Sequence, residues 1–334
     1  MKPVLSAEKE LLLGMSDEQV VEIFRRAGLA ELMGYQHSAI DKVRNEKKST
    51  ALAELNGLVG MDETKRQLNK LIAFFRMQKI AIMRGITASK VNSNMVFVGN
   101  PGTGKTEGAR IFAKLLAEVG ITKKELFIEC GRADIVAKYA GHTAKNVKAL
   151  VKKALGGVLF IDEAYSLCEE SERGNFGEEA INTLLQEVEN HRGELVVILA
   201  GYPKPMQEFL DSNPGLKSRF PNVIQFPDYS AEELYEISAQ IAKRNGFCFS
   251  QDVKEKLIPI FNNAIKIENY GNARFARNMV ETAELNLAEN LSKKYKDFNQ
   301  LSNEQLFTLT ASEFDMPHLV EDYVTKRKMG FGFD

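Results

Sequence analysis

Residues 99–106 read Gly-Asn-Pro-Gly-Thr-Gly-Lys-Thr and match the pattern G-x-x-x-x-G-K-[ST] without a mismatch. Its glycines let the backbone turn tightly, so that successive N–H groups can point at phosphate oxygens. Lys105 supplies a positive charge for β- and γ-phosphates, and Thr106 supplies a hydroxyl for Mg²⁺. An expected strand at 94–98 precedes the loop and an expected helix at 108–116 follows it. This order brings a helix N-terminus to the phosphates and predicts a nucleotide site.

A second signal is a pair of adjacent carboxylates at the end of an apolar run. Residues 157–161 are uninterrupted in their apolar character, as in a strand buried on both faces, and Asp162 and Glu163 follow. Asp162 suits Mg²⁺, because a hard dication prefers oxygen ligands, and Glu163 suits activation of a water that attacks the γ-phosphate. Taken alone, the two carboxylates could equally cap a turn. Beside a phosphate loop, the pair favours hydrolysis over transfer to a substrate hydroxyl.

Composition limits the classes of protein to consider. The chain has 334 residues, of which 44% are hydrophobic and 27% charged, which fits about two folded domains. A net charge of −1 gives no global basic field to attract nucleic acid or an anionic membrane. Cys130, Cys168 and Cys248 form no CxxC pair, so we expect neither disulfides nor a zinc site. The chain has no apolar run of about 18 residues and no recognisable signal peptide, so we predict a cytoplasmic protein without membrane contacts.

Strands and helices alternate through the middle of the chain. Strands are expected at 94–98, 125–130, 157–162, 195–200 and 222–226, and the helices expected between them include 108–116, 143–154 and 177–190. This alternation predicts an α/β fold with a parallel five-stranded sheet and right-handed crossovers.

The character of the sequence changes at Ser230, after which only helical patterns remain, at about 231–245, 252–264 and 272–293. We therefore predict a small all-helical domain after the α/β domain. The predicted divisions are a helical segment of unknown role at 1–50, a nucleotide-binding domain at 51–229, the small helical domain at 230–312 and a C-terminal tail at 313–334.

Six segments, in order, resemble those of AAA+ ATPases, and within that group the CbxX/CfqX family. They are Gly-Asn-Pro-Gly-Thr-Gly-Lys-Thr from 99, Tyr-Ala-Gly-His-Thr-Ala from 139, Leu-Phe-Ile-Asp-Glu-Ala-Tyr-Ser-Leu from 159, Val-Val-Ile-Leu-Ala-Gly-Tyr from 196, Asn-Pro-Gly-Leu-Lys-Ser-Arg-Phe from 213 and Gly-Asn-Ala-Arg-Phe-Ala-Arg-Asn from 271. The resemblance covers about residues 55–310. It implies a P-loop NTPase fold with a parallel five-stranded sheet flanked by helices, followed by a small all-helical lid.

The resemblance also implies roles for single residues. Arg219 resembles the arginine finger, which reaches the γ-phosphate of a neighbouring subunit, although a surface arginine is the alternative. Arg274 resembles the sensor-2 arginine that ties the lid to the nucleotide, and Arg277, one turn on, is the second candidate. Tyr202 stands at the sensor-1 position, where many members carry Asn or Thr. It could donate a hydrogen bond there or simply pack as an aromatic side chain.

Two loops complete the implied machinery. Tyr139, Ala140 and Gly141 resemble the aromatic pore loop of protein-threading members, with a tyrosine packed into the core as the alternative. Val59 and Gly60 fall in the loop that resembles the segment covering the adenine, where backbone and apolar contacts suit a neutral base. Together with Arg274, the predicted ATP-binding residues are Val59, Gly60, Asn100, Pro101, Gly102, Thr103, Gly104, Lys105, Thr106 and Glu107.

These observations predict a Mg²⁺-dependent ATPase that forms a homo-oligomer, expected to be a hexamer, and pulls on an unidentified client protein. Its cofactors would be ATP and Mg²⁺. One rival is a nucleic-acid-directed motor or loader, which the near-neutral charge and the pore tyrosine disfavour. Another is a regulatory ATPase that docks through residues 1–50 in a secretion or phage-related assembly. A small-molecule kinase is a distant alternative, because the Asp-Glu pair and the lid arginines do not favour it.

Overall fold

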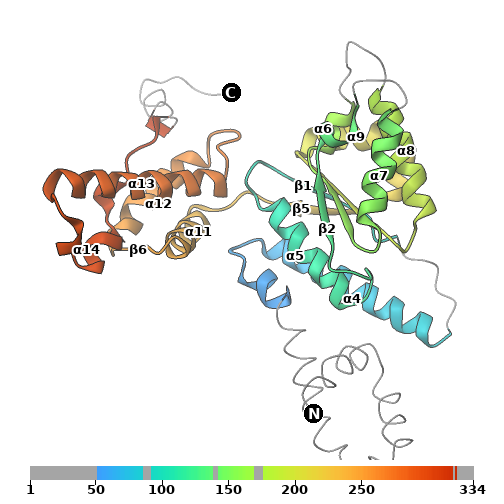
Figure 1. Ribbon diagram of the computed structural model, residues 1–334, viewed down its shortest axis with the longest axis horizontal. Helices are drawn as coiled ribbons and strands as arrows, with labels where there is room; N and C mark the ends of the chain where they lie inside the picture. Colours follow the sequence, from blue (N-terminus) through green and yellow to red (C-terminus); the bar gives the residue numbers. More distant parts are fainter. Residues whose placement is uncertain (1–50, 86–91, 138–141, 169–175, 319, 322–334) are drawn as a thin grey trace, which may run out of the picture. The chain divides into compact units, whose positions relative to one another are not determined.

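The computed structural model describes residues 51–85, 92–137, 142–168, 176–318 and 320–321 (Figure 1). The predicted segment 1–50 and the predicted pore loop, Tyr139 to Gly141, lie outside these residues. The chain divides into two compact units, residues 1–56 and 57–334. In the first unit, residues 51–56 are helical. All further description concerns the second unit.

The centre of this unit is a sheet of five parallel strands in the order β2-β3-β4-β1-β5. The strands are β1 (Met95–Gly99), β2 (Phe127–Cys130), β3 (Val158–Ile161), β4 (Val196–Gly201) and β5 (Asn222–Phe226). Each corresponds to a strand expected from the sequence, so the predicted α/β fold with a five-stranded parallel sheet is confirmed. All residues of β1, β3 and β4 are buried, which is why these strands read as uninterrupted apolar runs.

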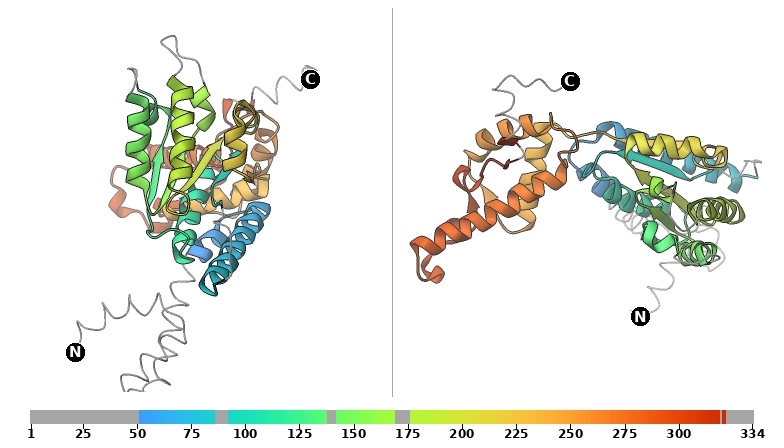
Figure 2. Two further views of the ribbon diagram at one scale, coloured as in Figure 1. Left: turned by 90° about the vertical axis from the view of Figure 1, so that its right-hand side faces the viewer. Right: turned by 90° about the horizontal axis from the view of Figure 1, so that it is seen from above.

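Helices cover both faces of the sheet (Figure 2). One face packs against α4 (Asp62–Met83) and α5 (Lys105–Glu118). The other packs against α7 (His142–Ala154), α8 (Phe176–Asn190), α9 (Pro203–Ser212) and α10 (Pro214–Arg219). Because side chains alternate along a strand, Leu159 and Val197 join the second layer. Helix α6 (Arg132–Ile135) is a short connection after β2. None of the helices in the described ranges is both long and apolar enough to cross a membrane.

The strand order brings three loops together. β4 lies between β3 and β1, and all three strands are parallel, so the residues that follow them meet at one edge of the sheet. The connection that leaves β1 runs toward β2 at one edge of the sheet, and the connection that leaves β4 runs toward β5 at the other edge. Ligands of open α/β sheets bind at such a switch point, outside the carboxyl ends of the strands.

The lid consists mainly of α11 (Ala231–Arg244), α12 (Val253–Ala264), α13 (Ala273–Lys294) and α14 (Asn303–Phe307). The predicted helical lid is therefore confirmed. Ser230 begins α11 with a reciprocal cap: its hydroxyl accepts from the backbone N–H of Glu233, whose carboxylate accepts from the backbone N–H of Ser230. The lid also contains a parallel pair of two-residue strands, β6 (Cys248–Phe249) and β7 (Thr308–Leu309). The sequence did not predict this pair, because a strand of two residues is too short to show an alternation of apolar and polar side chains.

The folded lid continues beyond residue 312, where the sequence analysis placed the start of a tail. Phe314 is only 1% exposed, and its ring lies 5.5 Å from that of Phe249. The side-chain amide of Asn286 donates to the carbonyl of Glu313 at 2.8 Å and to the carboxylate of Asp315 at 2.9 Å. Residues 313–315 therefore pack with the lid helices.

Candidate nucleotide-binding site

The loop between β1 and α5 has the backbone of a phosphate cradle. Gly104 precedes the first residue of α5 with φ of 88°, and Gly102 has φ of 73°, both in the left-handed region that favours glycine. At Gly102 a side chain also has no room, since a Cβ would lie 2.1 Å from the carbonyl oxygen of Gly271. Helix α5 begins at Lys105, so its first N–H groups face the loop, as an anion site requires.

Lys105 is held inside this loop. Its ammonium donates to the carbonyl of Gly99 at 2.7 Å and to that of Asn100 at 2.9 Å, and the residue is 8% exposed. Burial lowers the pKa of Lys105 below its ordinary value, and the charges of Asp162 and Glu163 oppose this shift. A buried ammonium in this loop is well suited to bind an anionic ligand such as a phosphate.

Asp162 and Glu163 follow β3 directly. The backbone N–H of Asp162 donates to the carbonyl of Cys130 at 2.9 Å, which continues the pairing of β2 and β3 by one residue. Glu163 then adopts φ of 47°, a left-handed conformation that is uncommon for a residue with a side chain. Strained backbone of this kind concentrates at functional sites, where neighbouring structure holds it in place.

Tyr202 links the end of β4 to this turn. Its hydroxyl donates to Oε1 of Glu163 at 3.2 Å, and its ring lies 5.7 Å from that of Tyr165. The Lys105 ammonium lies 5.4 Å from the centre of the same ring. Burial, followed by the charge of Glu163, raises the pKa of Tyr202, so its hydroxyl stays protonated and can donate. Tyr202 therefore donates a hydrogen bond to Glu163 and packs against Tyr165, and its role as sensor 1 stays a prediction.

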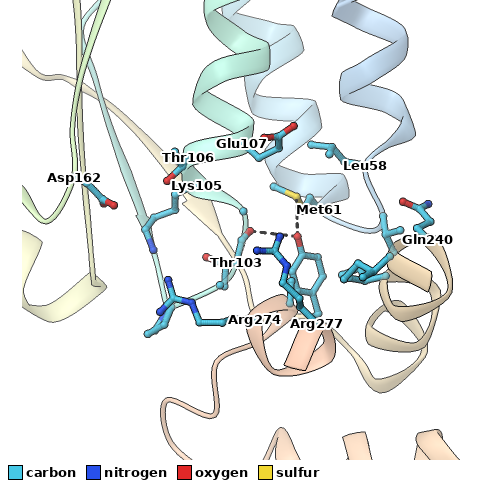
Figure 3. Close-up of a pocket in the computed structure, with 18 of the residues that line it drawn as sticks. Leu58, Met61, Thr103, Lys105, Thr106, Glu107, Asp162, Gln240, Arg274 and Arg277 are labelled. Atoms are coloured by element: carbon cyan, nitrogen blue, oxygen red, sulfur yellow. Dashed lines mark hydrogen bonds between the residues drawn. The ribbon is translucent and has the colours of Figure 1, made fainter. Parts of the chain in front are cut away.

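A cavity of about 450 Å³ joins these groups (Figure 3). Its walls come from the loop before α4, the phosphate loop, the ends of β3 and β4, and helices α11 and α13. The predicted residues that line it are Val59, Pro101, Gly102, Thr103, Gly104, Lys105, Thr106, Glu107, Asp162, Glu163 and Arg274. In Figure 3, Lys105, Thr106 and Asp162 lie at one end, and Leu58 and Gln240 lie at the other.

Sequence reasoning assigned only Val59 to the apolar end of the cavity and missed most of the other residues there. Leu58, Met61, Tyr229, Ile237 and Ile241 line it, with the polar side chains of Gln240 and Arg244 beside them. Most of these residues come from the lid side of the chain, far in sequence from the phosphate loop. The helical spacing of apolar residues on α11 is the same whether they line a cavity or pack in a core, so the sequence pattern could not tell the two apart.

Two predicted nucleotide contacts do not line the cavity. The side-chain amide of Asn100 donates to both carboxylate oxygens of Asp228, at 3.1 and 2.9 Å. Gly60 faces the start of α11, where a Cβ would lie 1.9 Å from the carboxylate of Glu233. Both residues therefore contact the beginning of the lid.

Three arginines of the lid line the cavity. Arg274 and Arg277 lie one turn apart on α13, and Arg244 ends α11. No ion pair joins any of these guanidinium groups to the residues that the structure describes. The charge of Arg274 acts on Lys105 and Tyr202, which places it at the phosphate end. Both candidates for the sensor-2 arginine thus reach the cavity.

Arg219, the predicted arginine finger, does not line the cavity of its own chain. It is the last residue of α10, and its Nε lies 3.4 Å from Oε2 of Glu189 on α8. This Nε has no hydrogen bond among the described residues, and the side chain is 31% exposed. Its guanidinium therefore lies outside the cavity of its own chain.

Comparison with known families agrees with this arrangement. Residues 95–228 match the model of the ATPase family associated with various cellular activities (AAA), and residues 230–322 match the AAA lid domain. The chain belongs to the AAA family of ATPases. The predicted family is therefore confirmed. The prediction that the chain is an ATP-hydrolysing enzyme is confirmed with it.

Among its relatives, stage V sporulation protein K of Bacillus subtilis is 41% identical over 75% of this chain and 80% of the relative. The Protein CfxQ homolog of Galdieria sulphuraria is 35% identical over 81% of this chain and 90% of the relative, in line with the CbxX/CfqX family. The ESX-3 secretion system protein EccA3 of Mycobacterium tuberculosis is 37% identical over 82% of this chain, which spans only 46% of that longer protein. The crystal structure of the FIGL-1 AAA domain in complex with ADP shares the fold, with a TM-score of 0.55, 16% identity and coverage of 82% of this chain and 89% of that one.

Proposed function

We propose that this ATPase hydrolyses ATP with Mg²⁺ in the cavity described above, assembles as a hexameric ring, and uses hydrolysis to remodel or thread a client protein. The observation that carries the proposal is the convergence of Lys105, Asp162, Glu163 and Arg274 on one cavity that also has an apolar end. Such a cavity suits a ligand with a polyphosphate at one end and an uncharged ring system at the other.

The phosphate end supports a division of roles. Thr106 and Asp162 would hold Mg²⁺, because both present oxygen atoms to the cavity wall beside Lys105. The ion would supply positive charge that offsets the negative charge on the phosphate oxygens. Lys105 would bind the same oxygens, and Glu163 would accept a proton from the attacking water. Arg274 would bind the terminal phosphate from the lid side.

The apolar end supports binding of the base. Val59, which sequence reasoning assigned to the adenine, lines the cavity together with Leu58, Met61, Ile237 and Ile241. These side chains can enclose a flat ring without charge. The amide of Gln240 offers a donor and an acceptor for the edge of the ring or for the ribose hydroxyls.

Action across a subunit boundary is supported by Arg219. The residue lies outside its own cavity and pairs only loosely with Glu189, so it can serve a neighbouring nucleotide. Client threading rests on the resemblance of Tyr139, Ala140 and Gly141 to an aromatic pore loop. In a ring, these loops would line the central channel and grip an extended chain through apolar contacts.

A regulatory role in a secretion assembly is a second candidate. The relative EccA3 carries the name of a secretion system, and it is more than twice as long as the segment that matches here. Under this reading the same ATPase drives assembly or release of a partner, and residues 1–50 dock on it. Deleting residues 1–50 would then abolish partner binding while ATP hydrolysis persists.

The main test combines assembly and turnover. Sedimentation of the full chain with ATP should give a hexamer, and the ATPase rate per subunit should rise with protein concentration. The Glu163→Gln variant should retain clients that a Glu163→Gln, Tyr139→Ala double variant loses. A single subunit that hydrolyses ATP at full rate at every concentration would overturn the ring mechanism. Stimulation by DNA that disappears at raised salt would instead favour a nucleic-acid motor.

A further inference from the structure

One buried amide joins the lid to the phosphate loop. Asn272, immediately before α13, is 1% exposed. Its Oδ1 accepts from the backbone N–H of Tyr229 at 3.0 Å and from the hydroxyl of Tyr270 at 2.8 Å. Its Nδ2 donates to the carbonyl of Pro101 at 3.2 Å and to Oδ1 of Asp228 at 2.8 Å. The four hydrogen-bonding positions of the side chain are all used.

Neighbouring contacts extend this junction along the phosphate loop. The carboxylate of Asp228 also accepts both hydrogen bonds from Asn100. The backbone N–H of Ala273 donates to the carbonyl of Gly102 at 3.1 Å, where the two chains approach too closely for a side chain. Asn100 is therefore fastened to Asp228, just before the lid, and residues 101 and 102 are fastened to the start of α13. The term junction below means residues 100–102, Asp228 and Asn272.

The backbone at Asn272 explains why its side chain matters. Its φ of 50° and ψ of −126° lie in a region that glycine occupies freely and that other residues rarely adopt. Glycine would fit this backbone with less strain. The presence of asparagine at this position is therefore explained by the four hydrogen bonds of its side chain, and those bonds run to both the lid and the phosphate loop.

We propose that Asn272 is a positioning residue that acts through Arg274, two residues further along α13, and so couples the phosphate loop to the lid. This inference rests on the proposed binding of ATP in the cavity. The junction fixes the start of α13 against the loop that holds Lys105, so the guanidinium of Arg274 faces the terminal phosphate without first having to be ordered. Without the amide, α13 can shift and this alignment is lost.

The test uses a cycle of two substitutions, Asn272→Gly and Arg274→Ala, in the full chain. Glycine removes the side chain and its four hydrogen bonds while accepting the backbone conformation without strain. The measured quantities are the dissociation constants of MgATP and MgADP by isothermal titration in a Glu163→Gln background, which prevents turnover. We expect each single variant to lower the preference for ATP over ADP by about tenfold, and the double variant to lower it no further.

Two results would overturn the coupling. If the two losses multiply in the double variant, Asn272 acts independently of Arg274. If Asn272→Gly weakens ATP and ADP equally, its role is only structural. Should Asn272→Gly fail to fold, Tyr270→Phe decides the question, because it leaves the ring and removes the hydrogen bond to Oδ1 together with a longer one, 3.4 Å, to the carbonyl of Tyr229. It should reduce the preference for ATP, and the matched control Tyr235→Phe, which lies elsewhere in the lid, should not.

Nucleotide binding by the Glu163→Gln chain without further substitutions tells a failure of this inference from a failure of the proposed function. If the Glu163→Gln chain binds neither nucleotide, the proposed function fails. If it binds ATP but the losses of ATP preference from the two substitutions multiply in the double variant, only the coupling through Asn272 fails.

Discussion

The hydroxyl of Tyr202 donates to Oε1 of Glu163 at 3.2 Å, across the ends of two adjacent parallel strands. The bond gives the proposed catalytic carboxylate a fixed direction. Because burial raises the pKa of Tyr202, the donor remains neutral well above physiological pH. The same side chain therefore contacts both Glu163 and Lys105.

Replacing Tyr202 by phenylalanine should slow hydrolysis without weakening ATP binding. The ring would keep its contacts with Tyr165 and Lys105, and only the hydrogen bond to Glu163 would be lost. We expect kcat to fall about three- to tenfold with KM unchanged, since one such bond is worth about 1 kcal/mol. Steady-state phosphate release measures both constants, with Tyr235→Phe as the control. An unchanged kcat would remove the hydroxyl from the mechanism.

Replacing Glu163 by glutamine should stop turnover and leave binding intact. The amide keeps the size of the side chain but cannot accept a proton from water, so we expect the rate to fall by about 10²- to 10⁴-fold. Filter-binding with labelled ATP should give an affinity close to that of the parent chain. Turnover near the parent rate would contradict the assignment of Glu163 as the base.

Replacing Arg219 by alanine should abolish ATP turnover, because each subunit would lose the arginine that a neighbouring subunit supplies to its nucleotide. An arginine finger typically contributes about 10³- to 10⁵-fold to kcat. Arg192 provides a matched control, because it also pairs with Glu189, at 3.7 Å, on the same surface. We expect Arg219→Ala to bind ATP normally and Arg192→Ala to retain full activity. Mixing Arg219→Ala subunits with subunits of the parent chain should partly restore turnover. Equal losses of turnover in Arg219→Ala and Arg192→Ala would instead attribute the effect to their shared pairing with Glu189.

Affinity for ATP should fall as the pH rises, and Lys105 should cause the fall. Burial lowers the pKa of Lys105 below its ordinary value of 10.5, so the ammonium loses its proton at a lower pH than an exposed lysine does. The charge that binds phosphate is present below the shifted pKa and lost above it. Titrations from neutral to alkaline pH measure the effect. Lys105→Arg should remove it, since arginine stays charged. The same alkaline loss in Lys105→Arg would assign it to another group.

The sheet depends on large aromatic side chains below the site. Phe97 on β1 is fully buried, and its ring lies 4.9 Å from that of Phe226 on β5. Truncation to alanine should lower the free energy of unfolding of the α/β domain by about 3–5 kcal/mol. Denaturant unfolding measures this loss. Phe298→Ala in the lid, where the side chain is 40% exposed, should cost much less, and similar costs at the two positions would contradict the packing described here.

The sequence predicted those parts of the molecule that local pattern determines. Buried runs such as 158–161 indicated the parallel strands, and the phosphate loop indicated the start of α5. Residues adjacent to these patterns, from Pro101 to Glu107 and at Asp162 and Glu163, were also found on the cavity wall.

Contacts between distant segments could not be predicted in the same way. The side-chain partner of Asn100 is Asp228, 128 residues further along the chain, so no local pattern predicted this contact. The apolar end of the cavity depends on how Ile237 and Ile241 face Leu58, and no spacing within α11 encodes that relationship. The bond between Tyr202 and Glu163 likewise depends on strand order rather than on either local sequence.

The pairing of β6 with β7 has a mechanical consequence. It returns the C-terminal part of the lid to the connection between α11 and α12, where the backbone N–H of Ser250 donates to the carbonyl of Leu309 at 2.9 Å. Phe314 then packs onto Phe249 beside the same connection. Unfolding of the lid from its C-terminal end would therefore break contacts with this connection, so we expect the lid to unfold as one cooperative unit.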